Sequence, residues 1–176
     1  IEEAEIDFDA EPLSNSGIFL ITGKTGSGKS TILDCICLAL YGTTPRLENT
    51  NIQGATTDLE TEVKVNDSRL LMRRNTSECS VCLTFVGNDK KCYQAEWSCK
   101  RARGKVEGAL QSKTRQLTNL TDNFVYSKDK DIVPEIKRII GLDFEQFLRT
   151  VMLSQGEFTR FLNSKDNEKA EILEKL

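Results

Sequence analysis

The sequence contains no histidine among its 176 residues. These residues therefore hold no Ser-His or Cys-His catalytic pair and no zinc site that depends on imidazole. No apolar run approaches the roughly 18 residues of a membrane-spanning helix, and residues 1–5 lack the basic and apolar regions of a secretion signal. We therefore expect a cytoplasmic protein without a membrane partner.

An excess of positive charge is also absent, because 24 Lys and Arg stand against 27 Asp and Glu. This balance excludes a polycation that coats nucleic acid. The bases nevertheless gather in residues 90–115, as Lys90, Lys91, Lys100, Arg101, Arg103, Lys105, Lys113 and Arg115. We expect residues 99–115 to form a loop whose bases either contact DNA phosphates or are simply solvated.

Six cysteines without a secretion signal indicate reduced thiols. Cys79 and Cys82 form a C-x-x-C pair, but the spacing to Cys92 and Cys99 matches no common zinc module. Alternating polarity around the pair predicts a strand, which places Cys79 and Cys82 on opposite faces. We therefore favour packing over metal binding for these thiols.

One motif indicates a specific chemistry. It reads Gly23-Lys24-Thr25-Gly26-Ser27-Gly28-Lys29-Ser30 and fits G-x-x-x-x-G-K-[ST]. Glycines let backbone N–H groups wrap a polyphosphate, and the positive end of the following helix adds to the attraction. We expect Lys29 to reach the β- and γ-phosphates, Ser30 to bind Mg²⁺, and the loop through Thr31 to bind ATP or GTP.

The residues around this motif fit a strand–loop–helix unit. The apolar run 17–22 predicts a strand buried on both faces, as in a parallel sheet. Residues 29–41 predict a helix that is buried on most sides and ends at Gly42. Residues 46–60 are polar and predict a loop.

The rest of the chain divides into a β-rich part and a helical part. Alternating polarity predicts strands over about 61–98, with a hairpin turn at 87–89. Helical periodicity follows over about 130–163. Gly141 is expected to end one helix there, and Asp143 with Gln146 to form the capping box of the next.

Two further motifs are ambiguous. Asn119-Leu120-Thr121-Asp122 echoes the guanine-binding motif of small GTPases, but Leu replaces its Lys, which argues against that class. Leu153-Ser154-Gln155-Gly156-Glu157 fits a blurred ABC signature, a Q-loop, in which Gln155 would bridge Mg²⁺ and the attacking water, or simply a break between helices. These residues alone leave all three interpretations open, and no strand-borne second acid for Mg²⁺ is evident.

Together these stretches resemble the N-terminal part of bacterial SbcC proteins, the SMC-related ATPase subunits of SbcCD nucleases. The likeness lies in residues 21–34, 37–42, 44–46, 71–79, 97–98, 101–103, 153–158 and 161–163. It implies an α/β fold, namely a P-loop NTPase (ABC-type) half-head with an antiparallel β subdomain and C-terminal helices. It also implies that Gln155 is the Q-loop glutamine and that a coiled coil begins at about residues 165–176.

The resemblance further implies an ATP-driven switch on DNA. Two SbcC subunits would sandwich two ATP molecules, and the C-terminal half of the same head would add the signature, Walker B acids and switch histidine. An SbcD-type nuclease would be the partner. Lys29 and Gln155 would be catalytic, Ser30 and Gln155 would hold Mg²⁺, and this segment alone would be inactive as an ATPase.

Two alternatives remain open from the residues. One is a stand-alone P-loop kinase of small molecules, with a lid supplied by Arg73 and Arg74 or by Arg101 and Arg103. The other is an interaction module that binds nucleotide without turnover.

Overall fold

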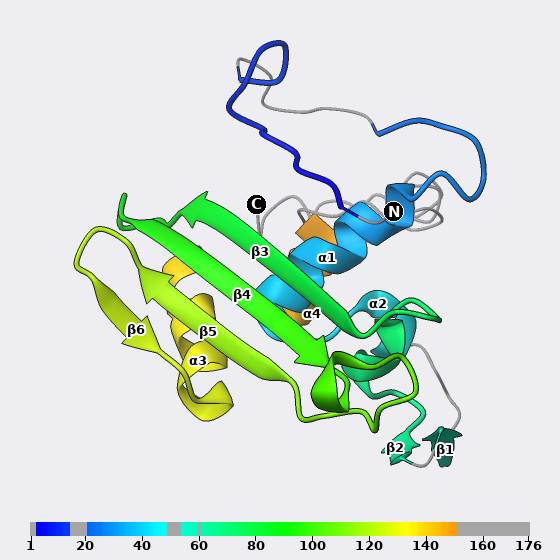
Figure 1. Ribbon diagram of the computed structural model, residues 1–176. Helices are drawn as coiled ribbons and strands as arrows, with labels where there is room; N and C mark the ends of the chain where they lie inside the picture. The colour runs from blue at the N-terminus through cyan, green and yellow to red at the C-terminus, as the bar shows by residue number, and fades with distance from the viewer. Residues whose placement is uncertain (1–2, 15–20, 49–53, 60, 151–176) are drawn as a thin grey trace, which may run out of the picture.

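The computed structural model describes residues 3–14, 21–48, 54–59 and 61–150 (Figure 1). Its elements in chain order are α1 (Lys29–Tyr41), α2 (Pro45–Glu48), β1 (Ala55–Asp58), β2 (Thr61–Lys64), the 3-10 helix η1 (Ser68–Leu71), β3 (Glu78–Val86), β4 (Cys92–Lys100), the short turn η2 (Ala102–Gly104), β5 (Thr114–Asn119), β6 (Phe124–Tyr126), α3 (Asp129–Ile140) and α4 (Phe144–Thr150). Most of the strand expected over 17–22, and the coiled coil expected over 165–176, lie outside the described residues.

The described strands form two antiparallel sheets. Strands β3, β4, β5 and β6 lie side by side in that order, and β1 pairs with β2 in a separate hairpin. Alternating polarity explains β3 and β4, since Tyr93, Ala95 and Trp97 point inward and are almost fully buried. The same alternation turns Cys79 inward and leaves Cys82 exposed, as the sequence predicted.

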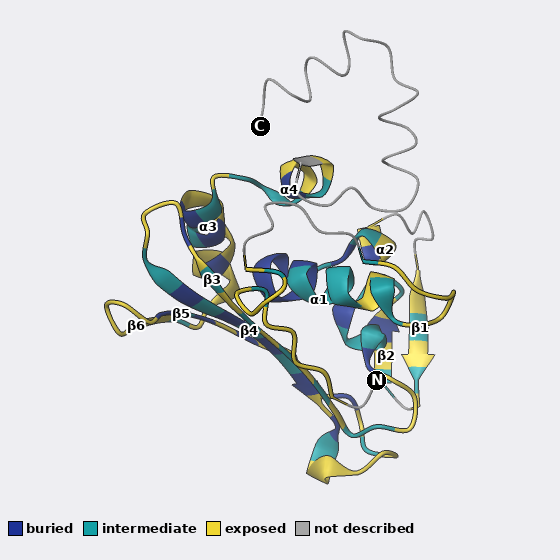
Figure 2. Cartoon of the chain, turned by 90° about the horizontal axis from the view of Figure 1, so that it is seen from above, coloured by how far each residue is buried: buried dark blue, intermediate teal, exposed yellow. Residues whose placement is uncertain are grey.

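Helices α1 and α3 cover one face of the four-stranded sheet (Figure 2). The core between these layers combines the C-terminal half of α1, the inner faces of β4 and β5, and the isoleucine stripe of α3. Its fully buried members are Cys37, Ala39, Leu40, Tyr93, Ala95, Leu117, Ile132, Ile136 and Ile139. Among the described residues, no helix has the length and apolar content needed to cross a bilayer.

The helix ends follow the signals read in the sequence. Gly42 and Gly141 both adopt the left-handed conformation (φ 73° and 82°), and each N–H bonds back into the helix that it ends. Asp143 and Gln146 form the expected capping box, in which each side-chain oxygen accepts the other's backbone N–H at 3.0 Å. These contacts fix both ends of the link between α3 and α4.

Two predictions of irregular structure are wrong. Residues 46–60 contain most of α2 and all of β1. Residues 99–115 contain the end of β4, the turn η2 and the start of β5. The loop prediction failed at the start of β5 because Arg115 occupies an inward position there, which hides the alternation of polarity.

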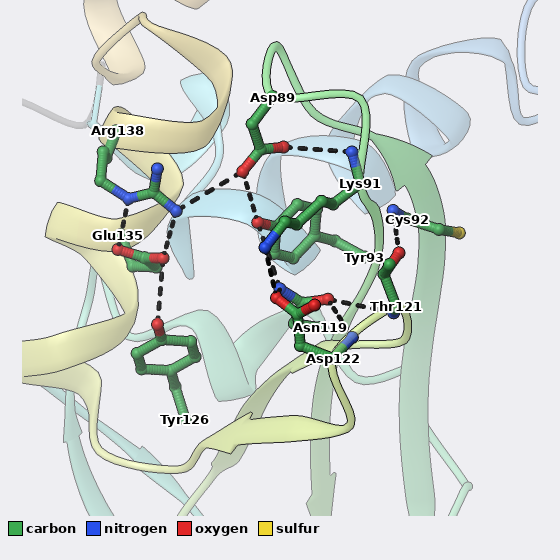
Figure 3. Close-up of polar contacts among 10 residues, drawn as sticks. All are labelled: Asp89, Lys91, Cys92, Tyr93, Asn119, Thr121, Asp122, Tyr126, Glu135 and Arg138. Atoms are coloured by element: carbon green, nitrogen blue, oxygen red, sulfur yellow. Dashed lines mark hydrogen bonds and ion pairs between the residues drawn. The ribbon is translucent and has the colours of Figure 1, made fainter.

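A polar network ties the tip of the β3–β4 hairpin to α3 and β6 (Figure 3). Asp89 accepts a hydrogen bond from the Tyr93 hydroxyl (2.8 Å) and pairs with Arg138 of α3 (3.7 Å). Arg138 also pairs with Glu135 (2.7 Å), whose carboxylate accepts the Tyr126 hydroxyl (3.0 Å). The network therefore joins three elements of the sheet and helix layers at one end of the molecule.

Candidate functional site

The loop before α1 has the backbone shape that its glycines permit. Gly28 caps the helix in the left-handed conformation with φ 91°, and Gly26 has φ 83°. A side chain at Gly26 would meet no atom within 4 Å, so the backbone conformation and not space requires glycine there. The turn is closed by a hydrogen bond from Ser27 N to Lys24 O (3.1 Å).

The N-terminus of α1 presents unpaired backbone donors at this loop. The first intrahelical bond runs from Ile32 N to Gly28 O (3.2 Å), so the N–H groups of Lys29, Ser30 and Thr31 precede it. No acidic residue lies in the first turn to neutralise the helix dipole. This arrangement attracts an anion.

The Lys29 ammonium lies against the loop. Its Nζ donates to Gly23 O at 2.7 Å and to Lys24 O at 2.8 Å. Ser30 and Thr31 are exposed on the first turn, as are Thr25 and Ser27 in the loop. The loop therefore brings a cation, exposed hydroxyls and helix N–H groups to one place, whereas Gln155 lies outside the described residues.

The far end of α1 is held by a buried arginine that the sequence did not single out for this role. Arg115 of β5, whose side chain is 4% exposed, donates to Leu40 O (2.9 Å) and to Asp129 (3.0 Å). Burial lowers the pKa of the Arg115 guanidinium, and the pairing with Asp129 opposes that shift. Arg115 therefore anchors the helix that begins at the glycine-rich loop.

An ion pair links the middle of α1 to α2. Arg46 contacts Asp34, a half-buried residue on α1. Burial raises the pKa of the Asp34 carboxyl, and the charge of Arg46 opposes that shift. This pair gives a structural role to two residues that belong to the stretches resembling SbcC.

Part of the basic segment is internal. Arg101 has a side chain that is 10% exposed, and it bonds both carboxylate oxygens of Asp58 (2.8 and 3.1 Å). The predictions that Arg101 contacts phosphate or belongs to a mobile lid are therefore wrong. Arg101 instead attaches β1 to the chain that follows β4. Lys100, Arg103 and Lys105 remain exposed.

The segment that echoed a guanine-binding motif is a turn between β5 and β6. The Asn119 carboxamide oxygen accepts the N–H groups of Thr121 and Asp122 (both 3.0 Å), and its NH₂ group donates to Asp122 (3.0 Å) and to the Tyr93 hydroxyl (3.4 Å). Asn119 is thus a turn-forming residue.

Burial keeps the inner cysteines protonated. It raises the pKa of the Cys37 thiol to about 12 and that of the Cys99 thiol to about 11. In the part of the chain that the structure describes, no three Cys, Asp or Glu side chains gather closely enough to hold a metal ion. The C-x-x-C pair is split across the two faces of β3.

Comparison with known proteins adds to this geometry. A family profile described as an AAA domain matches residues 1–176. The chain is 44% identical over 176 residues to the SbcC subunit of the nuclease SbcCD from Pseudomonas aeruginosa, in a match that covers 99% of this chain and 14% of that protein. The proteins of the same name from Rhodobacter capsulatus and Bacillus subtilis are 42% and 34% identical over 177 and 180 residues. Those matches cover 97% and 99% of this chain, and again 14% of each relative.

Proposed function

This chain belongs to the AAA domain family, and from that premise we propose that residues 23–31 form the ATP- and Mg²⁺-binding loop of the ATPase subunit of an SbcCD-type nuclease. The position of Lys29 supports this most directly, because its ammonium lies in the loop at the start of α1 and bonds two exposed backbone carbonyls that a phosphate can replace. The names of the relatives support a nuclease subunit over a small-molecule kinase.

Binding of the triphosphate follows from charge and geometry. The Lys29 ammonium exchanges its two carbonyl contacts for phosphate oxygens, and the N–H groups of residues 29–31 donate to the same anion. The open space beside Gly26 lets the backbone approach the phosphates closely. Lys29 then stabilises the negative charge that develops on the γ-phosphate during hydrolysis.

The donor set also suits Mg²⁺, a hard cation that prefers oxygen ligands. The exposed hydroxyl of Ser30 and the side-chain oxygen of Gln155 would hold it. When bound, Mg²⁺ supplies positive charge beside the β- and γ-phosphates. Gln155 has the additional role of orienting the attacking water.

The remaining catalytic groups belong to other polypeptide in this proposal. The signature, the Walker B acids and the switch histidine come from the C-terminal half of the same head, and a second subunit completes the ATP sandwich. The chain spans 14% of the length of the relatives it matches, which supports placing these groups outside it. Head engagement would then regulate an SbcD-type nuclease that acts on DNA.

Phosphate release by the full-length protein with its nuclease partner tests the proposal. We expect the wild type to hydrolyse ATP, this segment alone to bind ATP without turnover, and Gln155→Ala to bind ATP while losing turnover. Transfer of the γ-phosphate to a small acceptor would instead identify a kinase. Binding without turnover by the full complex would identify a nucleotide-binding interaction module.

DNA contact is proposed only for the exposed part of the basic segment, at Lys100, Arg103 and Lys105. Charge reversal at Lys100 and Arg103 in the full complex should reduce the slope of log affinity against log salt by about 0.9 for each phosphate that is no longer neutralised. Lys130→Glu on α3 is the matched control and should leave the slope unchanged. An unchanged slope in the Lys100 and Arg103 variants would exclude this surface.

A further inference from the structure

Strand β6 is an open edge of the four-stranded sheet (Figure 1). Within the described residues it pairs with β5 alone, over Phe124–Tyr126. Half of the exposed large apolar side chains of the described residues lie in or beside this strand, namely Leu120, Phe124, Val125 and Val133. Exposed apolar side chains that gather beside an open sheet edge are typical of a surface that binds another polypeptide.

The backbone of Val125 faces the open side of this edge. Leu120, directly after β5, donates its N–H to Cys92 O of β4 (2.9 Å). Successive residues of a strand turn their backbone groups to opposite sides, so Thr118 also faces β4 and not β6. Thr118 is the partner of Val125 in the register of β5 and β6. The N–H and C=O of Val125 therefore point away from β5, where a further strand can bond them.

A groove of about 710 Å³ is lined by β6 and α3. The Tyr126 hydroxyl donates to Glu135 of α3 (3.0 Å), so this ring faces the helix (Figure 3). The Phe124 ring meets it edge-on, with centroids 4.8 Å apart, and is on the same side of the strand. Pro134 lines the groove from α3. The groove therefore has apolar surface within reach of side chains from a strand added beside β6.

The exposed charge around this groove is mainly positive. Its exposed charged side chains are Lys128, Lys130, Asp131 and Arg138. Glu135 also lines the groove, but its carboxylate is already bonded to Arg138 (2.7 Å) and to the Tyr126 hydroxyl. Neither Lys128 nor Lys130 forms an ion pair within the part of the chain that the structure describes. Acidic side chains on a ligand would complement these two lysines.

We propose that β6 and this groove bind an extended acidic segment of a partner polypeptide, which adds to the sheet as a further strand. One residue of that segment exchanges hydrogen bonds with the N–H and C=O of Val125. The side chains on either side of that residue face α3, an apolar one beside Phe124 and an acidic one beside Lys130. This surface uses none of residues 23–31, so it does not depend on the proposed nucleotide site.

The test measures binding of a fluorescent peptide to the full-length protein by anisotropy. The peptide has about eight residues, with threonine at every second position and valine and aspartate in turn between them. We expect saturable binding, and we expect the peptide to slow amide hydrogen exchange in residues 123–127. The same peptide with lysine in place of aspartate should bind at least about fivefold more weakly.

Two variants test the backbone and the charge separately. Val125→Pro removes the outward N–H and leaves the hydrogen bonds between β5 and β6 in place, so it should weaken binding at least about tenfold. Lys130→Glu changes only an exposed side chain and should weaken binding roughly threefold to tenfold. Lys100→Glu, at an exposed base outside the groove, is the matched control and should leave the affinity within about twofold.

Four results would overturn the proposal. One is the absence of saturable binding to the wild type, and another is equal binding of the lysine peptide. The third is unchanged affinity in both Val125→Pro and Lys130→Glu, which would place the peptide elsewhere. The fourth is slow exchange of the Val125 amide before the peptide is added, which would show that this protein or a second copy already occupies the edge.

Discussion

The strongest test of the proposed nucleotide site replaces Lys29, which lies in the glycine-rich loop before α1. In the Lys29→Ala protein, the ammonium that bonds Gly23 O and Lys24 O is absent. Two charge-assisted hydrogen bonds to phosphate oxygens contribute about 3–6 kcal/mol, and the two exposed carbonyl hydrogen bonds given up on binding offset about 1–2 kcal/mol. The net loss of about 2–4 kcal/mol predicts an ATP Kd that is roughly 30- to 900-fold weaker.

The assay is a calorimetric titration of Mg·ATP into the full-length protein. Lys24→Ala is the matched control, since it removes the same charge from the same loop at an exposed side chain, and it should weaken binding by no more than about threefold. Both variants should unfold within about 1 kcal/mol of the wild type, because the hydrogen bonds removed are exposed. Equal weakening by the two substitutions would show that net charge matters and that the position of Lys29 does not.

Three further predictions concern stability. Gly87→Ala should destabilise the protein by about 1–3 kcal/mol in urea unfolding, because the new Cβ would lie 2.5 Å from a methyl group of Ile139. Gly104→Ala is the control: no atom lies within 4 Å of its new Cβ, so it should cost only the backbone strain of a positive φ. Arg115→Met should cost about 1–3 kcal/mol through the buried Leu40 carbonyl that it leaves unbonded, and equal stability of the variant would refute the anchoring role. The hydrogen bond from Arg138 lowers the pKa of the Glu135 carboxyl in the folded protein (Figure 3). The ionised carboxylate therefore contributes to folding stability above the unfolded-state pKa near 4.5, and this contribution is lost as pH falls through the folded-state pKa. The stability difference between wild type and Glu135→Gln should therefore shrink in that acidic window, and a difference that does not depend on pH would contradict the assignment.

Local signals in the sequence predicted the elements that have strong periodicity or clear ends. Helix α1 was predicted at its observed bounds, because Gly28 and Gly42 mark both ends and the residues between them are apolar. The resemblance to the N-terminal part of SbcC is confirmed by relatives that are up to 44% identical over nearly the whole chain. The AAA-type P-loop domain with helices and antiparallel sheets agrees with the coarser part of the fold prediction.

The missed features depend on contacts between distant residues. The loop predicted over 99–115 includes the start of β5, because Arg115 occupies an inward position there and its partners Leu40 and Asp129 are far away in the sequence. Arg101 was counted with the exposed bases, although Asp58 pairs with it across 43 residues. A run of basic residues predicts exposed side chains only when no acidic residue from another segment packs against it. Local sequence patterns do not reveal such a long-range pair.

The turn after β5 has a consequence for base selectivity. The carboxamide of Asn119 uses both donor hydrogens and its acceptor oxygen on Tyr93 and on the residues that follow it. The Asn119 side chain therefore has no free donor or acceptor with which to hydrogen-bond the edge of a purine base. If residues 23–31 bind a nucleotide as proposed, the preference for adenine or guanine is decided away from the Asn119 side chain, and exchanging this asparagine should loosen the turn between β5 and β6 without changing that preference.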